Sequence, residues 1–103
     1  MKIIEMNQGQ KIAYEQSGTR IYFGDDELMV NAAKYQKDWP VVVDICKDRA
    51  GNLTIGTESA LRYVAQIKIP AAKYTATAEG EEITHEQIPL DMDEVELYLW
   101  GIE

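Results

Sequence analysis

Apolar and polar side chains alternate along several short segments of this 103-residue chain, and turn residues separate the segments. A repeat of two residues is typical of a β-strand with one buried face. The repeat is longest over 61–69, where alternate residues are apolar until Pro70 ends the run. A helix capped by Thr57 is the alternative for the start of this segment, but the alternation continues beyond it. The pattern therefore predicts a fold built mainly from strands.

The most complete hairpin signal spans 11–23. Ser17 and Gly18 form the expected two-residue turn, because glycine adopts the positive φ that tight hairpin turns require. Pairing about this turn places Glu15 opposite Arg20, which joins opposite charges across the strands. The same pairing collects the apolar side chains on one face: Ile12, Tyr14, Ile21 and Phe23.

A second hairpin is expected over 41–56. The loop 49–51 fits a type I turn that Gly51 closes in the left-handed conformation. The apolar residues of its two strands then share one face: Val43, Ile45, Leu53 and Ile55. Further along, 74–78 is a candidate strand, and 78–87 is interpreted as a loop because Gly80 stands among charged residues.

Residues 26–37 fit both a helix and a strand. Asp25 as an N-cap and Pro40 beyond the end favour a helix. Against this, 23–27 fits a hairpin turn, and apolar side chains alternate after it: Leu28, Val30 and Ala32. The helical interpretation is slightly favoured.

The last segment, 91–102, is apolar on both faces beyond Glu96. One face carries Val95, Leu97 and Leu99, and the other carries Tyr98, Trp100 and Ile102. Such a strand is either central between two covered faces or lies at an interface. Tyrosine and tryptophan are enriched at interfaces. The second face is therefore a candidate interface, with burial in a two-layer core as the somewhat favoured alternative.

Two hairpins and at least two further strands predict a single mainly β domain over 1–103. The expected fold is an antiparallel β-sandwich or a partly open barrel, with at most one or two short helices. A chain of this length buries roughly two thirds of its unfolded surface, which is enough for a core without disulfides. Cys46 is the single cysteine, and neither a signal peptide nor a long apolar span is visible, so a cytoplasmic protein is expected.

Acidic residues are concentrated towards the end of the chain. Of the 18 acidic residues, nine lie in 79–103, where there is no Lys or Arg, and the net charge is −8. Such a surface repels nucleic acid and anionic membranes and attracts basic proteins, so neither direct nucleic-acid binding nor membrane binding is expected. The acidic surface candidates are Glu79, Glu81, Glu82, Glu86, Asp91, Asp93, Glu94 and Glu96.

Residues able to carry chemistry are few in this sequence. Four carboxylates within 91–96 invite comparison with a cation site, but alternate residues of a strand point to opposite faces and do not converge. His85 is expected to be a solvated loop residue, and Cys46 a small, semi-buried one. We therefore predict no catalytic residue, no metal and no cofactor.

These observations favour a non-enzymatic protein-binding or assembly module, whose partner is another protein or a second copy of the chain. An acidic decoy that imitates the phosphates of DNA is the first alternative, because arrayed carboxylates engage the basic grooves of DNA-binding proteins. A metal-dependent enzyme is the second. No motif identifies a family, although the chain has the look of small proteins of bacterial prophages and mobile elements.

Overall fold

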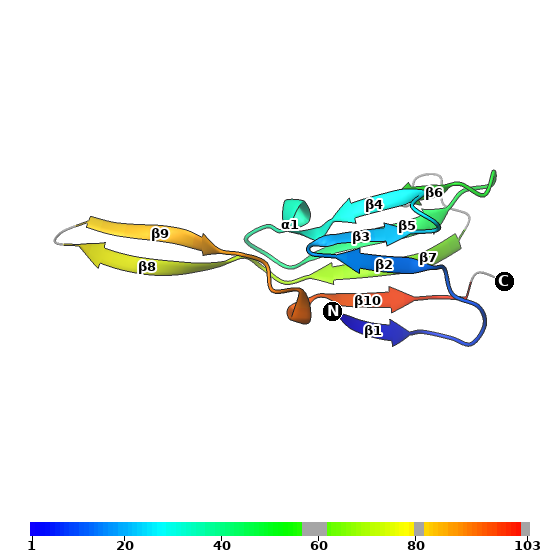
Figure 1. The fold of residues 1–103 in the computed structure, drawn as a ribbon, viewed down its shortest axis with the longest axis horizontal. Helices are drawn as coiled ribbons and strands as arrows, with labels where there is room; N and C mark the ends of the chain where they lie inside the picture. The colour runs from blue at the N-terminus through cyan, green and yellow to red at the C-terminus, as the bar shows by residue number, and fades with distance from the viewer. Residues whose placement is uncertain (57–61, 80–81, 102–103) are drawn as a thin grey trace.

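The protein is seen here in a computed structural model that describes residues 1–56, 62–79 and 82–101, with the backbone alone at 77–79 and 82–84. The described residues form three β-sheets and very little helix (Figure 1). The predicted mainly β fold with antiparallel sheets is confirmed. Two of the sheets enclose a shared core in a sandwich-like arrangement that does not close into a barrel.

The largest sheet has five strands in the order β1-β10-β7-β5-β6. β1 pairs in parallel with β10, and all the other neighbours are antiparallel. The strands are β1 (Lys2–Glu5), β10 (Glu96–Leu99), β7 (Arg62–Ile69), β5 (Val41–Lys47) and β6 (Leu53–Ile55).

A three-stranded sheet covers one face of the first and has the order β2-β3-β4. Its strands are β2 (Tyr14–Ser17), β3 (Arg20–Phe23) and β4 (Leu28–Asn31). Ile21 and Phe23 of this sheet are fully buried in one hydrophobic cluster with Ile67 and Leu97 of the five-stranded sheet. The core therefore lies between the two sheets.

The first predicted hairpin is confirmed, but its turn lies one residue later than expected. Gly18, with φ +60°, takes the first central position of the turn, and Thr19 takes the second. A glycine with positive φ at the first position is typical of a type II′ turn. Glu15 consequently faces Tyr22 and not Arg20. The apolar face keeps its members, because partners move by two residues and two is the repeat of the strand.

The favoured helix over 26–37 is wrong, and the strand alternative describes most of the segment. Three consecutive residues have positive φ: Gly24 at 60°, Asp25 at 52° and Asp26 at 67°. This left-handed run forms the turn between β3 and β4, so Asp25 does not have the extended backbone of an N-cap. Helix is confined to one turn, α1 (Ala32–Tyr35), which Asn31 caps by accepting a hydrogen bond from the Ala33 N–H.

The second predicted hairpin forms as expected, with Ile45 opposite Ile55 and Gly51 at φ +82°. The strand predicted over 61–69 is confirmed from Arg62 onwards, and Leu61 lies outside the described residues.

This strand, β7, contains a bulge. Cys46 pairs with Tyr63 and its neighbour Ile45 with Ala65, so that Val64 is an extra residue in the ladder. A bulge of this kind turns two successive side chains to the same side. Val64 and Ala65 are accordingly both fully buried in the core, whereas Tyr63 is 44 % exposed.

The loop predicted over 78–87 is also wrong. Two seven-residue strands, β8 (Lys73–Glu79) and β9 (Glu82–Ile88), pair along their whole length, with Lys73 opposite Ile88. The candidate strand 74–78 is thus confirmed. The described side chains of β9, at 85–88, are all exposed. A strand without a buried face needs no apolar alternation, so the sequence pattern did not reveal it.

Candidate functional site

The hairpin of β8 and β9, here called the arm, is the most distinctive feature of the fold. It extends from one end of the two-sheet body, and the molecule measures 60 Å along this direction but only 24 Å and 21 Å across it (Figure 1). Seven extended residues span about 24 Å at roughly 3.4 Å per residue. The arm therefore presents much of its length away from the rest of the chain.

The described side chains of the arm are all exposed, on both strands. Tyr74 is 50 % exposed and Ile88 is 40 % exposed, and both are large apolar groups. The arm is a separate two-stranded sheet, and the pairings of the described strands leave its outer edges unpaired. Two strands alone are marginally stable in water at best.

The arm root, where the arm meets the body at 36–38, is held by several hydrogen bonds. The Tyr74 hydroxyl donates to Asp38 Oδ1 at 2.5 Å, and Gln87 Nε2 donates to Gln36 Oε1 at 3.1 Å. Just before β8, the Ala72 N–H donates to the Lys37 carbonyl oxygen at 2.7 Å. Both strands of the arm are thus tied to the same body segment, which fixes the direction in which the arm projects.

The bond to Asp38 raises the pKa of Tyr74 above its ordinary value of 10.0, with smaller contributions from partial loss of solvent and from the Asp38 charge. Because the folded pKa is the higher one, the root bond is intact below pH of about 10 and is lost as pH rises through the raised value. We expect NMR of ¹³C-labelled tyrosine to show Tyr74 titrating above the ordinary value, and nearer to it in Asp38→Ala. A Tyr74 midpoint unchanged by Asp38→Ala would contradict this contact.

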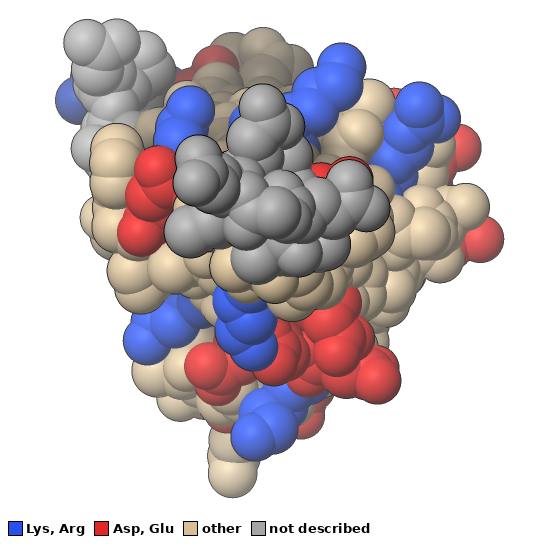
Figure 2. Space-filling view, turned by 90° about the vertical axis from the view of Figure 1, so that its left-hand side faces the viewer, with Lys and Arg blue, Asp and Glu red and all other residues tan. Residues whose placement is uncertain are grey.

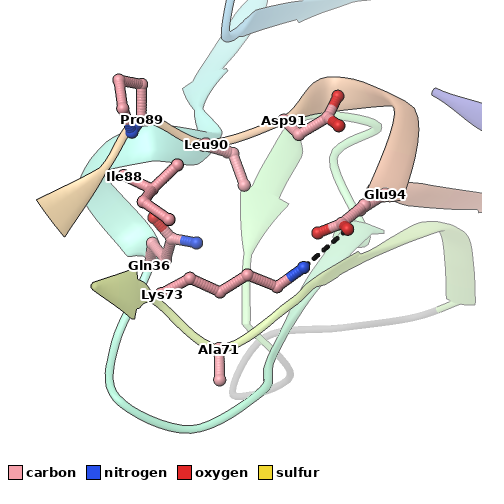
Figure 3. Close-up of a pocket in the computed structure, with 8 residues that line it drawn as sticks. All are labelled: Gln36, Ala71, Lys73, Ile88, Pro89, Leu90, Asp91 and Glu94. Carbon is pink, nitrogen blue, oxygen red and sulfur yellow. Dashed lines mark hydrogen bonds and ion pairs between the residues drawn. The ribbon is translucent and has the colours of Figure 1, made fainter. Parts of the chain in front are cut away.

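A pocket of about 240 Å³ lies beside the arm root. Its walls are Gln36, Ala71, Lys73, Ile88, Pro89, Leu90, Asp91 and Glu94. Lys73 Nζ and Glu94 Oε1 form an ion pair at 2.7 Å across one end (Figure 3). Ile88 and Pro89 lie on the side opposite Asp91 and Glu94. The two carboxylates stand out in the sequence, but the pocket does not, because its residues come from three separate stretches of the chain: 36, 71–73 and 88–94.

The acidic residues near the pocket belong to a short 3-10 helix, η1 (Met92–Glu94), and not to the long strand that was predicted over 91–102. Asp91 caps this turn by accepting a hydrogen bond from the Asp93 N–H at 3.0 Å. The amino group of Met1 lies 3.9 Å from Asp93. Viewed along the arm from its tip, acidic side chains gather in a patch beside basic ones (Figure 2).

The other acidic candidates are dispersed. Glu86 is exposed on β9, and Glu96 is half-buried on the five-stranded sheet, where it accepts a hydrogen bond from the Tyr98 hydroxyl at 3.1 Å. The side chains of Glu79, Glu81 and Glu82 lie outside the described part of the structure. Among the side chains that are described, no group of three or more His, Cys, Asp or Glu is arranged to hold a metal ion.

Tyr98 and Trp100 lie on the outer face of the five-stranded sheet, away from the three-stranded sheet. Leu97 and Leu99 of β10 are buried in the core, so the alternate residue Tyr98 points to the other side, where it is half-buried. Lys68 Nζ lies 4.7 Å from the Tyr98 ring centre. The Trp100 ring is 5.9 Å from that of Tyr63, and Ile102 is outside the described residues.

The two reactive residue types of the sequence have ordinary surroundings. Cys46 is fully buried, whereas the sequence predicted a semi-buried residue. Burial is the main cause that raises the pKa of its thiol, and the negative charge of Asp44 is a smaller one. A raised pKa disfavours the thiolate, which is the nucleophilic form. His85 is exposed, as predicted, but on β9 and not in a loop.

None of the described helices is long and apolar enough to cross a membrane. Comparison of the chain with protein-family models, with curated proteins and with solved structures finds no significant match to any of the three.

Proposed function

We propose that the chain is a non-enzymatic protein-binding or assembly module and that the arm is its main binding element. The observation that carries this proposal is that every described side chain of the arm is exposed, on a sheet of only two strands. Unpaired strand edges are templates for a further strand from another chain. A partner that adds to the arm would supply the burial that the arm lacks within this chain.

The outer aromatic surface, formed by Tyr63, Tyr98 and Trp100, is the second element of the proposal. Tyr63 is 44 % exposed, and the other two are half-buried. Aromatic side chains on a surface give a partner large apolar area at a small cost in conformational entropy. The surface belongs to the five-stranded sheet, and the backbone of pre-organised interfaces usually moves little on binding.

A site-specific crosslinking experiment tests the role of the arm. Ala76→Cys places a thiol on the exposed part of β8, and Ala13→Cys places one on the exposed surface of the body. The natural Cys46 is buried with a raised pKa, so a photoactivatable maleimide labels the introduced thiol selectively. In an extract of the native host, we expect the arm probe to give a discrete adduct that excess unlabelled wild-type chain suppresses.

The Ala13→Cys protein is the matched control and is expected to give no such adduct. An adduct of twice the chain mass would identify a second copy as the partner, and any other mass would identify a different protein. Equal products from both positions, or no suppressible product from the arm, would refute the arm as the binding element.

The acidic decoy is the alternative proposal, and the same experiment separates it from the first. A decoy engages its target through charge, so its adduct falls steeply with salt concentration. A partner held by strand addition and apolar contact loses little under the same conditions. The acidic candidates with described side chains lie on the arm, at η1 and its cap, and on the outer sheet face, and acidic side chains gather in a patch on the face seen in Figure 2. Their spread over three elements favours the binding module.

A further inference from the structure

The pocket at the arm root is too small for a typical small-molecule ligand. Its volume is about 240 Å³, whereas ligand pockets usually span about 300–1,000 Å³. Apolar side chains from the end of β9 and the segment after it form much of the wall: Ile88, Pro89 and Leu90. These dimensions suit one long side chain delivered by another molecule.

The charge of the pocket selects the kind of side chain. Asp91 and Glu94 contribute two carboxylates and Lys73 one ammonium group, which leaves an excess of one negative charge. An anionic or purely apolar occupant would therefore be at a disadvantage relative to a cationic one.

The ion pair that closes one end of the pocket is exchangeable. The side chain of Lys73 is 60 % exposed and that of Glu94 is 42 % exposed. An exposed pair of this kind contributes only about 0–1 kcal/mol, so the lysine readily yields its place to a better donor. Gln36 is already engaged, because its side chain donates to the Pro70 carbonyl oxygen and accepts from Gln87. Asp91 is engaged as the cap of η1, and its carboxylate points away from Lys73 (Figure 3). Glu94 is thus the carboxylate that an incoming cation reaches by displacing Lys73.

We propose that the pocket at the arm root receives an arginine side chain from an extended segment of a partner protein. This inference rests on the proposed binding function of the arm and specifies the chemistry of the partner. The aliphatic stem of the arginine packs along Ile88 and Leu90, and its guanidinium donates to Glu94. Arginine suits this site better than lysine, because a guanidinium engages a carboxylate through two parallel hydrogen bonds and is more weakly hydrated.

A pair of peptides tests the proposal directly. The probe is acetyl-Ser-Val-Arg-Val-Ser-amide, and its match carries citrulline, a neutral residue of nearly the same shape, in place of arginine. In ¹⁵N NMR titrations of the full chain, we expect the arginine peptide to bind in the millimolar range and to shift the amide signals of Ile88, Leu90 and Glu94. The citrulline peptide should bind at least about threefold more weakly, the ratio expected for losing one partly exposed charged hydrogen bond.

Two variants of the exchangeable pair give opposite expectations. Glu94→Gln removes the acceptor charge and should raise the Kd for the arginine peptide at least about threefold, while Lys73→Gln removes the competing cation and should lower the Kd. Glu5→Gln, exposed on β1 and outside the pocket, is the matched control and should leave the Kd unchanged. Unaltered spectra of the free variants, away from the substituted positions, confirm that each remains folded.

The proposal is overturned if both peptides bind equally, if neither binds, or if the shifted amides lie outside the pocket. It is also overturned if Glu94→Gln and Glu5→Gln behave alike. The crosslinking experiment tests the arm and the peptide titration tests the pocket. Refutation of the arginine pocket therefore does not refute the arm as a binding element. Conversely, arginine binding without an arm-specific adduct would support the pocket and refute the wider function.

Discussion

Replacement of Phe23 by alanine is expected to lower the free energy of unfolding by about 3–5 kcal/mol, the usual range for a buried phenylalanine. Phe23 is fully buried and comes first by volume among the fully buried side chains. It lies on β3, the central strand of the three-stranded sheet, and packs in the cluster that joins the two sheets. A single domain has only about 5–15 kcal/mol of stability in total, so this change removes a large part of it.

Urea denaturation followed by circular dichroism measures this loss. Trp39→Ala is the matched control, since it also removes a large aromatic group, but from a side chain that is 62 % exposed. Surface substitutions usually change stability by no more than about 0.5 kcal/mol. If the two variants were equally stable, the placement of the core between the two sheets would be wrong.

The second large effect is expected on β10, where adjacent residues face opposite sides of the sheet. Leu97 is fully buried in the core, and Leu97→Ala should cost about 2–5 kcal/mol. Tyr98 is half-buried on the outer face, and Tyr98→Ala should cost only about 1 kcal/mol, from one hydrogen bond and one cation–π contact. The same denaturation measurement compares both variants with the wild-type chain.

Light scattering on the same samples determines whether the chain is a monomer or a dimer, and the interpretation of the two stability losses depends on that state. In a monomer, comparable losses from Leu97→Ala and Tyr98→Ala would contradict the assignment of Tyr98 to an outer face. In a dimer, a large loss at Tyr98 that depends on protein concentration would show that a second copy covers this face.

Much of the strand content could be predicted from the sequence, because burial on one face leaves a clear two-residue repeat. The repeat placed Ile21 and Phe23 on the apolar face of their hairpin and Ile67 on that of β7. It did not fix the turn, because both Ser17-Gly18 and Gly18-Thr19 place the positive φ on glycine and keep the same faces. The two turns differ by a shift of two residues in the strand pairing. Such a shift leaves every side chain on the same face, so the alternation cannot distinguish them.

The segment 26–37 shows where local signals conflict. Its end signals were those of a helix, but Asp25 and Asp26 adopt left-handed backbone conformations that aspartate tolerates better than most residues. This turn lets Val30 pair with Ile21 in the three-stranded sheet and become fully buried. Tertiary packing thus outweighed the capping pattern, a competition that propensity alone does not decide.

The candidate site was the least predictable part of the molecule. The described side chains of the arm are exposed on both faces, so this part of β9 lacks the repeat that revealed the other strands. The pocket needs Gln36, Ala71 and Glu94 to meet, and only the folded chain brings them together. Sequence did single out the acidic residues on its wall and the aromatic face of β10, but not which of these surfaces adjoin the arm.

The extra residue in β7 determines which aromatic group the molecule shows to its surroundings. In a regular strand Tyr63 and Ala65, two residues apart, would point to the same face of the sheet, and the tyrosine would lie in the core. Because Val64 is an extra residue in the ladder, the tyrosine is turned outward and its ring reaches that of Trp100. One inserted residue thereby places Val64 and Ala65 in the core and the Tyr63 ring on the outer face. There the tyrosine forms an aromatic pair with Trp100.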